Sequence, residues 1–508
     1  MSDFAATIAT AYATEGAAVD LGRGVHDGAL VREAVVRVPL ATMNRHGLVA
    51  GATGTGKTKT LQLLTEQLSR AGVPVLVADV KGDVSGLAAP AAPGGAGEKR
   101  MADLGLPFAP EAFPVEFLAL GGLGPGVPVR ATVSDFGPQL LAKVLGANET
   151  QESSLALVFH YADAKALPLL DLGDLRALLT FLDSDAGKPE LEGIGGLSSA
   201  TVGVLLRSLV GLETGGGTEF FGEPQLDVAD LLRTAPDGRG VVSCVELAEV
   251  QDKPALWSTA LMWLVAELFE ALPEAGDLPQ PKLVVFLDEA HLLFADATDA
   301  FLDALARTVR LIRSKGVGIF FVTQQPTDLS EEVLAQLGLR IQHALRAFTP
   351  ADAKRLRATV STYPKSELYD VETLLTSVGT GEAAVTLLSE QGVPTPVVHT
   401  RMLAPASRME PADDVAGAAK ASPLWRKYGE RVDAQSAREM LAGRLAAPAA
   451  DAQPDLRAPM EHVPVPRRRR APSGNGSDTV GDFLRSREGK ALQRKVTRGI
   501  FGMLRKRL

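Results

Sequence analysis

Two spacings of hydrophobic residues alternate along most of the 508-residue chain. Short uninterrupted apolar runs, as in residues 74–78 and 282–287, predict strands that are buried on both faces of a sheet. Between such runs, apolar residues recur every three or four positions, as at Leu61, Leu64 and Leu68, which predicts amphipathic helices. Alternating strands and helices are typical of a mostly parallel sheet covered by helices, so we expect an α/β fold.

A long helical stretch interrupts this alternation once. Residues 139–235 show helical spacing with few strand signals, and we interpret them as a helical insertion that serves as a structural lid or as a contact to a neighbour. The core is then expected in two parts, residues 36–138 and 236–405. The expected strands are residues 47–50, 74–79, 240–246, 282–287 and 317–322, with candidates at 339–345 and 383–388, and the expected helices are residues 60–70, 254–272 and 298–313.

The two ends of the chain differ in pattern from the core. Near the start we expect a helix at residues 4–15 and a small strand at 36–38, and near the end a helix at 424–445. A stretch rich in Pro, Ala, Gly and Arg then predicts disorder. In chain order, the predicted terminal segments are an N-terminal helical segment (1–35), a C-terminal helical extension (406–445), a disordered linker (446–478) and a basic amphipathic helix (479–508).

The composition is that of a soluble globular protein, with 46% hydrophobic and 22% charged residues. No apolar run approaches the roughly 18 residues of a membrane span, and the N-terminus, with Asp3, lacks the basic start of a signal peptide. The single cysteine, Cys244, excludes an intrachain disulfide, and its apolar neighbours predict a buried strand residue rather than a nucleophile. These features together favour a cytoplasmic location.

The net charge of −9 conceals an uneven distribution. From Arg467 to the end there are 13 Lys/Arg and 3 Asp/Glu, so this tail carries +10 and the remainder of the chain carries −19. An acidic body does not favour a protein that coats DNA in general, although it leaves room for DNA held in a narrow basic channel.

Residues 51–58, Gly-Ala-Thr-Gly-Thr-Gly-Lys-Thr, fit the phosphate-binding pattern G-x-x-x-x-G-K-[ST]. Glycines let successive backbone N–H groups face phosphate oxygens, and the positive end of the following helix adds to the attraction. An expected strand before the loop and a helix after it favour nucleotide binding over a merely structural turn. We predict ATP with Mg²⁺, with Lys57 on the β- and γ-phosphates and Thr58 on the metal ion. The predicted nucleotide-binding residues are Gly51, Thr53, Gly54, Thr55, Gly56, Lys57, Thr58 and Lys59.

Acidic residues follow two of the expected strands. Asp288 and Glu289 come directly after residues 282–287, and we expect Asp288 to hold Mg²⁺ and Glu289 to polarise the attacking water. Asp79 ends another strand at the same sheet edge. Residues 288–291 spell DEAH, but the arginine-rich motifs of a second helicase domain are missing, so His291 is interpreted as a packing or hydrogen-bonding residue.

A polar amide follows the strand expected next to the acidic pair. Gln324, after residues 317–322, is predicted to contact the γ-phosphate or orient water. The alternative is that it only opens the turn before Pro326.

These motifs together resemble the HerA/FtsK superfamily of P-loop ATPases, specifically the bacterial HerA-like proteins of the YjgR type. The resemblance covers about residues 36–407 and extends to the basic terminal helix. The stretches that carry it, in chain order, are Asn-Arg-His-Gly (44–47), Ala-Asp-Val-Lys-Gly-Asp (78–83), Asn-Glu-Thr-Gln-Glu (148–152), Leu-Asp-Glu-Ala-His (287–291), Arg-Leu-Ile-Arg-Ser-Lys-Gly (310–316), Thr-Gln-Gln-Pro (323–326) and Gly-Thr-Gly-Glu-Ala (379–383).

The resemblance implies a RecA-like ATPase core whose active sites lie between subunits of a ring, commonly a hexamer. By position, Arg313 matches the arginine offered to a neighbour's nucleotide, with Arg310 as a rival one turn earlier. Arg45 matches a position near the phosphates and Asp79 one near the metal or water, although either could instead form an internal ion pair. HerA is a DNA translocase that works with a nuclease through an N-terminal β-barrel. Because only 50 residues precede Gly51, we do not expect that barrel and leave the nuclease partner and the ring open.

Two classes of function remain after these arguments. The first is a DNA translocase or helicase, which rests on the resemblance because no stretch of the core shows an evident basic and aromatic DNA-binding pattern. The second is a motor or switch that acts on a protein or at an anionic membrane surface, where the basic terminal helix could lie. That helix could equally dock on a neighbouring subunit.

Overall fold

The computed structural model describes residues 2–446 apart from residues 192, 277 and 295–298. The chain divides into two units, Met1–Arg444 and Leu445–Leu508, and the elements named below belong to the first, with the end of the last helix reaching into the second. The predicted basic helix and all but the first residue of the predicted linker lie outside the described residues. No helix in the described part of the chain is long and apolar enough to cross a membrane.

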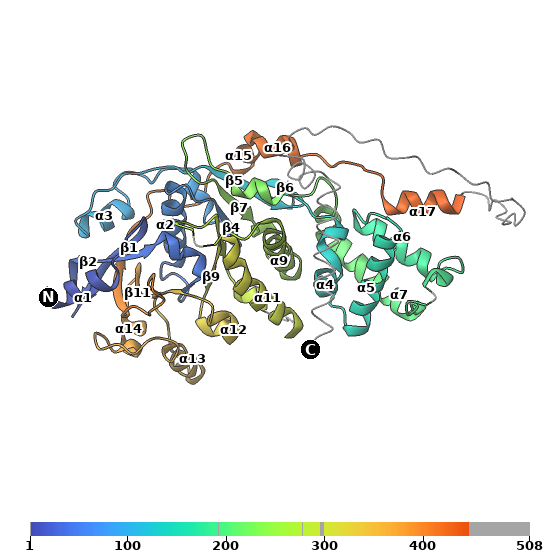
Figure 1. Ribbon diagram of the computed structural model, residues 1–508. Coiled ribbons are helices and arrows are strands. Elements are labelled where there is room, and N and C mark those ends of the chain that lie inside the picture. The colour runs from blue at the N-terminus through green and yellow to red at the C-terminus, as the bar shows by residue number, and fades with distance from the viewer. Residues whose placement is uncertain (1, 192, 277, 295–298, 447–508) are drawn as a thin grey trace, which may run out of the picture. The chain divides into compact units, whose positions relative to one another are not determined.

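A single 12-stranded sheet organises the first unit (Figure 1). The strand order is β2-β1-β12-β11-β10-β3-β9-β8-β4-β7-β5-β6. Neighbours from β10 through to β6 are parallel, whereas β10, β11, β12, β1 and β2 pair antiparallel. The strands are β1 (Ala18–His26), β2 (Ala29–Pro39), β3 (Gly47–Ala50), β4 (Val75–Asp79), β5 (Val115–Leu120), β6 (Val127–Val129), β7 (Val242–Glu246), β8 (Leu283–Leu287), β9 (Val317–Thr323), β10 (Leu339–Gln342), β11 (Glu382–Leu387) and β12 (Val398–Met402).

Helices fill most of the connections between these strands, which confirms the expected α/β fold with a mostly parallel sheet. The α-helices are α1 (Ser2–Ala11), α2 (Lys57–Arg70), α3 (Ala96–Asp103), α4 (Val133–Val144), α5 (Glu149–Ala164), α6 (Leu172–Asp183), α7 (Ser199–Leu212), α8 (Thr218–Phe220), α9 (Pro254–Ala271), α10 (His291–Phe294), α11 (Asp299–Ile312), α12 (Glu331–Leu334), α13 (Pro350–Val360), α14 (Val371–Ser377), α15 (Val415–Ala421), α16 (Pro423–Tyr428) and α17 (Ala437–Ala446).

The central strands are apolar along their whole length because both faces of the sheet are covered. In β8, Leu283 and Val285 point into one hydrophobic core, whereas Val284 and Phe286 point into a second core on the other face. The first core includes residues of α9 and α11, and the second includes residues of α1 and α2. Burial on both faces explains why the strand pattern is an uninterrupted run rather than an alternation.

Residues 139–235, which we interpret as a helical insertion, contain most of α4 and all of α5 to α8. Its first helix begins at Val133, six residues earlier than expected. The apolar faces of these helices belong to the same hydrophobic core as the strands and α9, and α4 packs directly on α9. The insertion therefore shares its core with the sheet instead of folding around one of its own.

The N-terminal segment differs from the helical prediction for residues 1–35. After α1, the chain forms the antiparallel pair β1 and β2 instead of a short connection. Register shifts at Asp20/Gly22 and Arg23/Gly24 break the regular alternation of inward and outward residues. Because that alternation is the sequence signal for a half-buried strand, β1 escapes prediction and only residues 36–38 of β2 are predicted. The strands β5, β6 and β12 also escape prediction.

The single helix expected at residues 424–445 is also wrong. The structure has α16 and α17 with an irregular stretch between them. There the Arg431 guanidinium donates to the carbonyl oxygens of Thr218 and Phe221, and the Val432 N–H donates to the Glu223 carbonyl at 3.1 Å. The Val432 N–H, which a continuous helix would have paired internally, is thus satisfied by a residue far earlier in the chain, and Arg431 holds the stretch against the same region.

Candidate functional site

The phosphate-binding loop leaves the carboxyl end of β3 and enters α2, as predicted. Gly54 and Gly56 adopt φ values of 79° and 117°, which a side chain would strain. Lys57 is buried and folds back on the loop, where its Nζ donates to the carbonyl oxygens of Gly51 at 2.7 Å and Ala52 at 3.2 Å. Burial lowers the pKa of Lys57. The ammonium group is thus held at the centre of the loop by groups that a phosphate could replace.

The other residues predicted for this loop have different surroundings. The Thr55 hydroxyl donates to the Ala52 carbonyl at 2.7 Å and therefore stabilises the turn. Lys59 does not face the loop, because its ammonium group contacts the Met409 carbonyl and the Gln62 side chain. Thr53 and Gly54 are exposed at the rim.

Asp288 and Glu289 follow β8 directly and lie buried at the same edge of the sheet. Burial and the adjacent Glu289 carboxylate raise the pKa of Asp288 to about 7. Glu289 has a positive φ of 46°, a conformation that is costly for a residue other than glycine. Its Oε1 contacts the ammonium group of Lys81, and its Oε2 lies 3.3 Å from Nδ1 of His291. The backbone and the contact with Lys81 thus orient this carboxylate, whereas its buried Oε2 makes no hydrogen bond in the described part of the chain.

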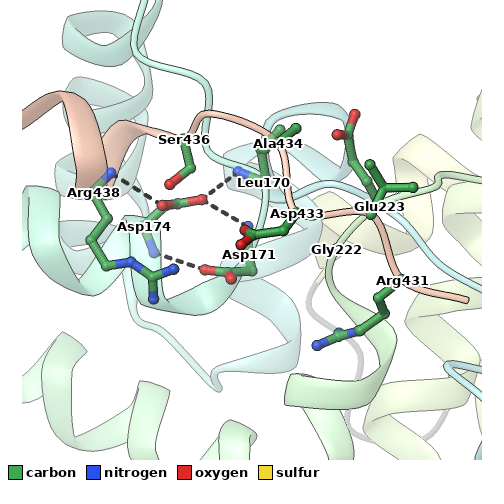
Figure 2. A pocket seen from close by; sticks show the side chains of 11 residues that line it. Leu170, Asp171, Asp174, Gly222, Glu223, Arg431, Asp433, Ala434, Ser436 and Arg438 are labelled. Carbon is green, nitrogen blue, oxygen red and sulfur yellow. Dashed lines mark hydrogen bonds between the residues drawn. The ribbon is translucent and has the colours of Figure 1, made fainter.

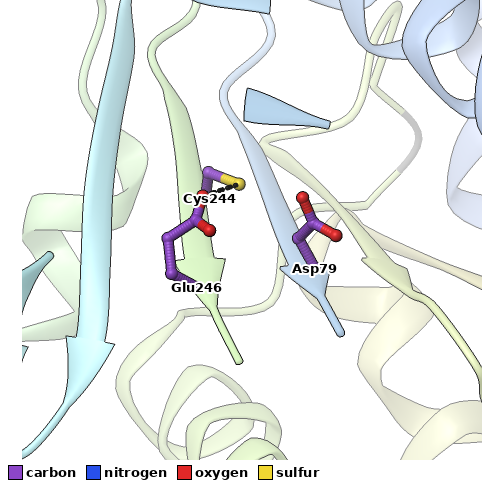
Figure 3. A group of neighbouring side chains, drawn as sticks. All are labelled: Asp79, Cys244 and Glu246. Carbon is purple, nitrogen blue, oxygen red and sulfur yellow. Dashed lines mark hydrogen bonds between the residues drawn. The ribbon is translucent and has the colours of Figure 1, made fainter. Parts of the chain in front are cut away.

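Asp79 is buried at the end of β4, next to Glu246 and Cys244 at the end of β7 (Figure 3). Its carboxylate accepts the backbone N–H groups of Lys81, Gly82 and Val84 at 2.8–3.1 Å. Burial is the main cause that raises the pKa of Asp79 to about 6. Asp79 therefore shapes the turn after β4, and its predicted role near a metal remains a proposal.

That turn carries Asp83, which the sequence reasoning did not assign. The Thr58 hydroxyl donates to Asp83 Oδ2 at 3.4 Å. Oδ1 of Asp83 is buried and has no hydrogen-bond partner in the described part of the chain. An unpaired carboxylate oxygen beside Thr58 fits a divalent cation, because hard cations such as Mg²⁺ prefer oxygen ligands. The only sequence signal is that Asp83 closes the string Lys-Gly-Asp after β4.

Two further residues, one directly after β10 and one directly before β11, complete this edge. His343 is fully buried, and its Nε2 lies 2.9 Å from the Thr60 hydroxyl in the first turn of α2. Burial lowers the pKa of His343 to about 4, so the imidazole is neutral near pH 7. The Gly381 N–H donates to the Thr55 carbonyl at 2.9 Å. These contacts hold the phosphate-binding loop against strands that are far away in the sequence.

Gln324 directly follows β9 and is exposed at the same edge. Its carbonyl accepts the Gly51 N–H at 3.1 Å, which places the residue beside the start of the loop. The side chain thus begins close to the position that the prediction requires.

Arg45 and Arg313, by contrast, lie at the opposite, amino edge of the parallel strands. Arg45 precedes β3 and donates to the carbonyl oxygens of Ser389 at 2.6 Å and Glu390 at 2.9 Å. Arg313 is exposed and precedes β9, whose seven residues span about 20 Å. Neither residue is therefore brought to the phosphate-binding loop of its own chain.

A separate cavity of about 230 Å³ lies between the start of α6 and the stretch before α17 (Figure 2). Its buried acid, Asp174, already accepts the backbone N–H groups of Leu170, Asp171 and Arg438. The bond to Arg438 holds the start of α17 against α6. Because the Asp174 carboxylate is already paired in this structural role, we assign no ligand to this cavity.

Known structures share this architecture across most of the chain. The bacterial conjugative coupling protein TrwBdeltaN70 in a trigonal form with sulphate has a TM-score of 0.53 and 15% identity, over 82% of this chain and 93% of that one. Its unbound monoclinic form has a TM-score of 0.52 and 15% identity, over 80% of this chain and 95% of that one. The plasmid coupling protein TrwB in complex with ADP and Mg²⁺ has a TM-score of 0.51 and 15% identity, over 79% and 98%.

A comparison with curated protein sequences found no significant match. The family model described as helicase HerA-like C-terminal, in contrast, matches residues 27–507. This match includes the loop that contains Lys57, the acids after β8 and both arginines of the amino edge. The chain therefore belongs to the helicase HerA-like C-terminal family of P-loop ATPases.

Proposed function

We propose that this protein hydrolyses ATP with Mg²⁺ and uses the energy to move DNA. The observation that carries the ATPase part is the carboxyl edge of the sheet, where Lys57, Thr58, Asp83, Asp288 and Glu289 converge. Burial lowers the pKa of Lys57 while these three acids raise it, so the groups lie within electrostatic reach of one another. The Mg²⁺ complex in one TrwB structure and the ATP-analogue complex in another support the choice of ligands.

Each residue at this edge has a distinct proposed task. Lys57 would exchange its two carbonyl partners for β- and γ-phosphate oxygens. Thr58 and Asp288, with Asp83 or Asp79, would hold Mg²⁺, which bridges phosphate oxygens and neutralises their charge when bound. Glu289 would accept a proton from the attacking water, because Lys81 contacts its Oε1 while its buried Oε2 makes no hydrogen bond in the described part of the chain.

Gln324 would orient that water from the adjacent strand end. Its exposed side chain follows β9, while its carbonyl is fixed by Gly51. An amide can both donate to and accept from a water molecule.

The amino edge supports an oligomer in which one chain completes the site of another. Arg313 is exposed at the far end of β9 from its own phosphate-binding loop. A guanidinium group that contacts the γ-phosphate of a neighbouring chain would stabilise charge in the transition state. We infer a homo-oligomer, with a hexamer as the form to test first, in which Arg313 has this role and Arg45 supports the same edge.

The decisive experiment is the steady-state ATPase rate with no DNA, with single-stranded DNA and with duplex DNA. The variant Lys57→Ala serves as the blank. Strong stimulation that is lost at high salt is expected for a DNA motor, because contacts to phosphates release counterions. A measurable basal rate that neither form of DNA changes would support the proposed ATPase activity and contradict the proposal that the protein moves DNA.

The uneven charge supports a second candidate, a motor that acts on a protein or at an anionic membrane surface. The tail from Arg467 carries +10 and the rest of the chain −19, and cationic segments bind anionic lipid. Deleting residues 478–508 and measuring liposome binding, DNA binding and oligomer mass would separate membrane contact, nucleic-acid contact and docking on a neighbouring chain.

A further inference from the structure

One large aromatic side chain is almost fully exposed. Phe348, between β10 and α13, has 86% of its surface accessible, whereas the next most exposed large hydrophobic residue in the described part of the chain, Val393, has 61%. An isolated exposed valine is ordinary, but a phenylalanine ring in water loses the benefit of burying a large apolar surface. This ring therefore calls for a partner.

Basic residues stand on both sides of Phe348 along the chain, and their side chains are also exposed. Residues 343–360 contain four Lys or Arg, all exposed, and one acid. Of the three on α13, Lys354 and Arg357 lie on the half of the helix that is turned away from the buried residues Leu356 and Thr359, whereas Arg355 lies one turn before Thr359 at the border of the buried side. No carboxylate among the described residues lies within ion-pair distance of any of the four. We call Arg346, Phe348, Lys354, Arg355 and Arg357 the α13 surface.

The single acid of this stretch is already in use. Asp352 accepts the backbone N–H groups of Phe348 at 3.2 Å and Thr349 at 3.0 Å, and its own N–H donates to the Thr349 hydroxyl. These hydrogen bonds lower the pKa of Asp352 and cap the start of α13. The acid thus fixes the backbone that presents Phe348, and although Arg355 contributes to lowering its pKa, this carboxylate forms no ion pair with the nearby cations of the described chain.

The other end of this stretch is attached to the phosphate-binding loop. The Ala344 carbonyl accepts the Ala52 N–H at 2.9 Å, and His343 contacts Thr60. Leu345 is buried and its N–H donates to the Leu375 carbonyl at 2.8 Å. Only Arg346 and Ala347 separate this anchor from Phe348, a path of at most about 14 Å from Ala344.

We propose that the α13 surface binds single-stranded nucleic acid, with a base stacked on Phe348 and backbone phosphates on the four cations. An aromatic ring beside flexible cations is the usual means of holding a single strand without reading its sequence. Because the same backbone stretch contacts the phosphate-binding loop, strand binding and ATP turnover are mechanically linked. The inference rests on the proposed DNA motor and deepens it by naming where the strand lies.

The folded arrangement reveals a pattern that the sequence does not. The five residues are spread over twelve positions with one aromatic among them, so no basic and aromatic stretch is evident. The capped helix α13 carries three exposed cations, and the loop before it carries Arg346 and exposes the ring. A single-stranded nucleic acid, whose bases are free to stack, fits both the cations and the Phe348 ring. An acidic peptide would contact only the cations, and the adenine base of ATP would contact only the ring.

The test is fluorescence anisotropy of a labelled oligothymidylate with the full chain, Mg²⁺ and a non-hydrolysable ATP analogue, across a series of salt concentrations. We expect Phe348→Ala to weaken single-strand binding about fivefold or more with the salt slope unchanged, because one stacking contact is lost. Phe348→Tyr should bind as the wild type does. The combined change Arg346→Ala, Arg355→Ala and Arg357→Ala should flatten the slope by about 2.

A matched control and a second substrate make the test specific. Arg207→Ala with Val210→Ala removes an exposed cation and an exposed apolar side chain from one face of α7 and should change nothing. With duplex DNA, Phe348→Ala should have little effect, because paired bases are already stacked, whereas the combined arginine variant should still bind more weakly. Denaturation midpoints equal to that of the wild type show that the variants fold.

Three results would overturn the inference in distinguishable ways. If the wild type binds the oligonucleotide and all α13 variants bind equally well, the strand lies elsewhere and the proposed motor survives. If Phe348→Ala raises the KM for ATP but leaves DNA binding intact, the ring contacts the nucleotide base. If the wild type neither binds DNA nor is stimulated by it, the proposed DNA function fails together with the inference.

Discussion

The two edges of the parallel sheet are built in opposite ways. At the carboxyl edge, functional groups are buried and contact one another: Lys57 lies on its loop, Glu289 faces Lys81, and His343 contacts Thr60. At the amino edge, Arg313 is exposed and lies far from the phosphate-binding loop of its own chain. The comparison teaches that, under the proposed function, one chain would hold most of a catalytic site while Arg313 is presented outward for a neighbouring chain.

The largest effect is expected at the buried edge. Lys57→Ala should abolish ATP hydrolysis and weaken ATP binding, because the ammonium group at the centre of the loop is removed. A coupled ATPase assay and nucleotide titration measure both. The control Lys99→Ala removes an exposed ammonium group from α3 and should retain wild-type turnover. Turnover in Lys57→Ala would contradict the assignment of this loop.

The next effect tests whether the exposed edge acts on another chain. Arg313→Ala should lower turnover about a thousandfold without lowering ATP binding to the same extent. Mixing it with Lys57→Ala chains should restore activity, because each mixed site can combine an intact loop with an intact arginine. Arg310→Ala, one turn earlier, is the matched comparison and should retain more activity. If mixing restores nothing, the two edges do not meet between chains.

Glu289→Gln should lower turnover by about a hundredfold or more while ATP binding persists, because the amide keeps the shape of the side chain but cannot accept the proton. Single-turnover measurement with radiolabelled ATP separates binding from chemistry. Unchanged turnover would exclude Glu289 as the base. It would also turn attention to the neighbouring buried carboxylate, Asp288.

The smallest effect concerns the contact between Lys81 and Glu289. Lys81→Ala should lower kcat about tenfold with little change in KM, because the carboxylate keeps its chemistry but loses the group that directs it. Lys81→Arg should restore most of the rate by supplying another cation. A rise in KM with unchanged kcat would instead indicate that Lys81 contacts the nucleotide.

How much of the site is predictable follows from the sequence distance between partners. The loop around Lys57 and the pair Asp288–Glu289 are recognisable because a strand, a turn and an acid stand next to one another in the chain. Lys81 is not recognisable in this way, because its partner lies 208 residues away in the sequence. The same holds for His343, whose partner lies 283 residues away. Asp83 lies 25 residues from Thr58, and nothing in the local pattern distinguishes it from a solvated turn acid.

The fold shows the same division between local and distant causes. The central parallel strands are predictable because burial on both faces makes them apolar throughout. The strand β1 and most of β2 are not, because register shifts between them break the alternation that would mark them. The helix expected at 424–445 fails because Arg431 gains its partners from the insertion, about 210 residues earlier.

The burial of Cys244 has a practical consequence. The chain has one thiol, it is fully buried in β7, and burial raises its pKa far above the ordinary range. Such a thiol reacts slowly with maleimides, which attack the thiolate. A cysteine introduced at an exposed position such as Val393 can therefore carry a fluorophore or spin label in the otherwise native chain, so its motions during turnover can be followed without first removing a background signal.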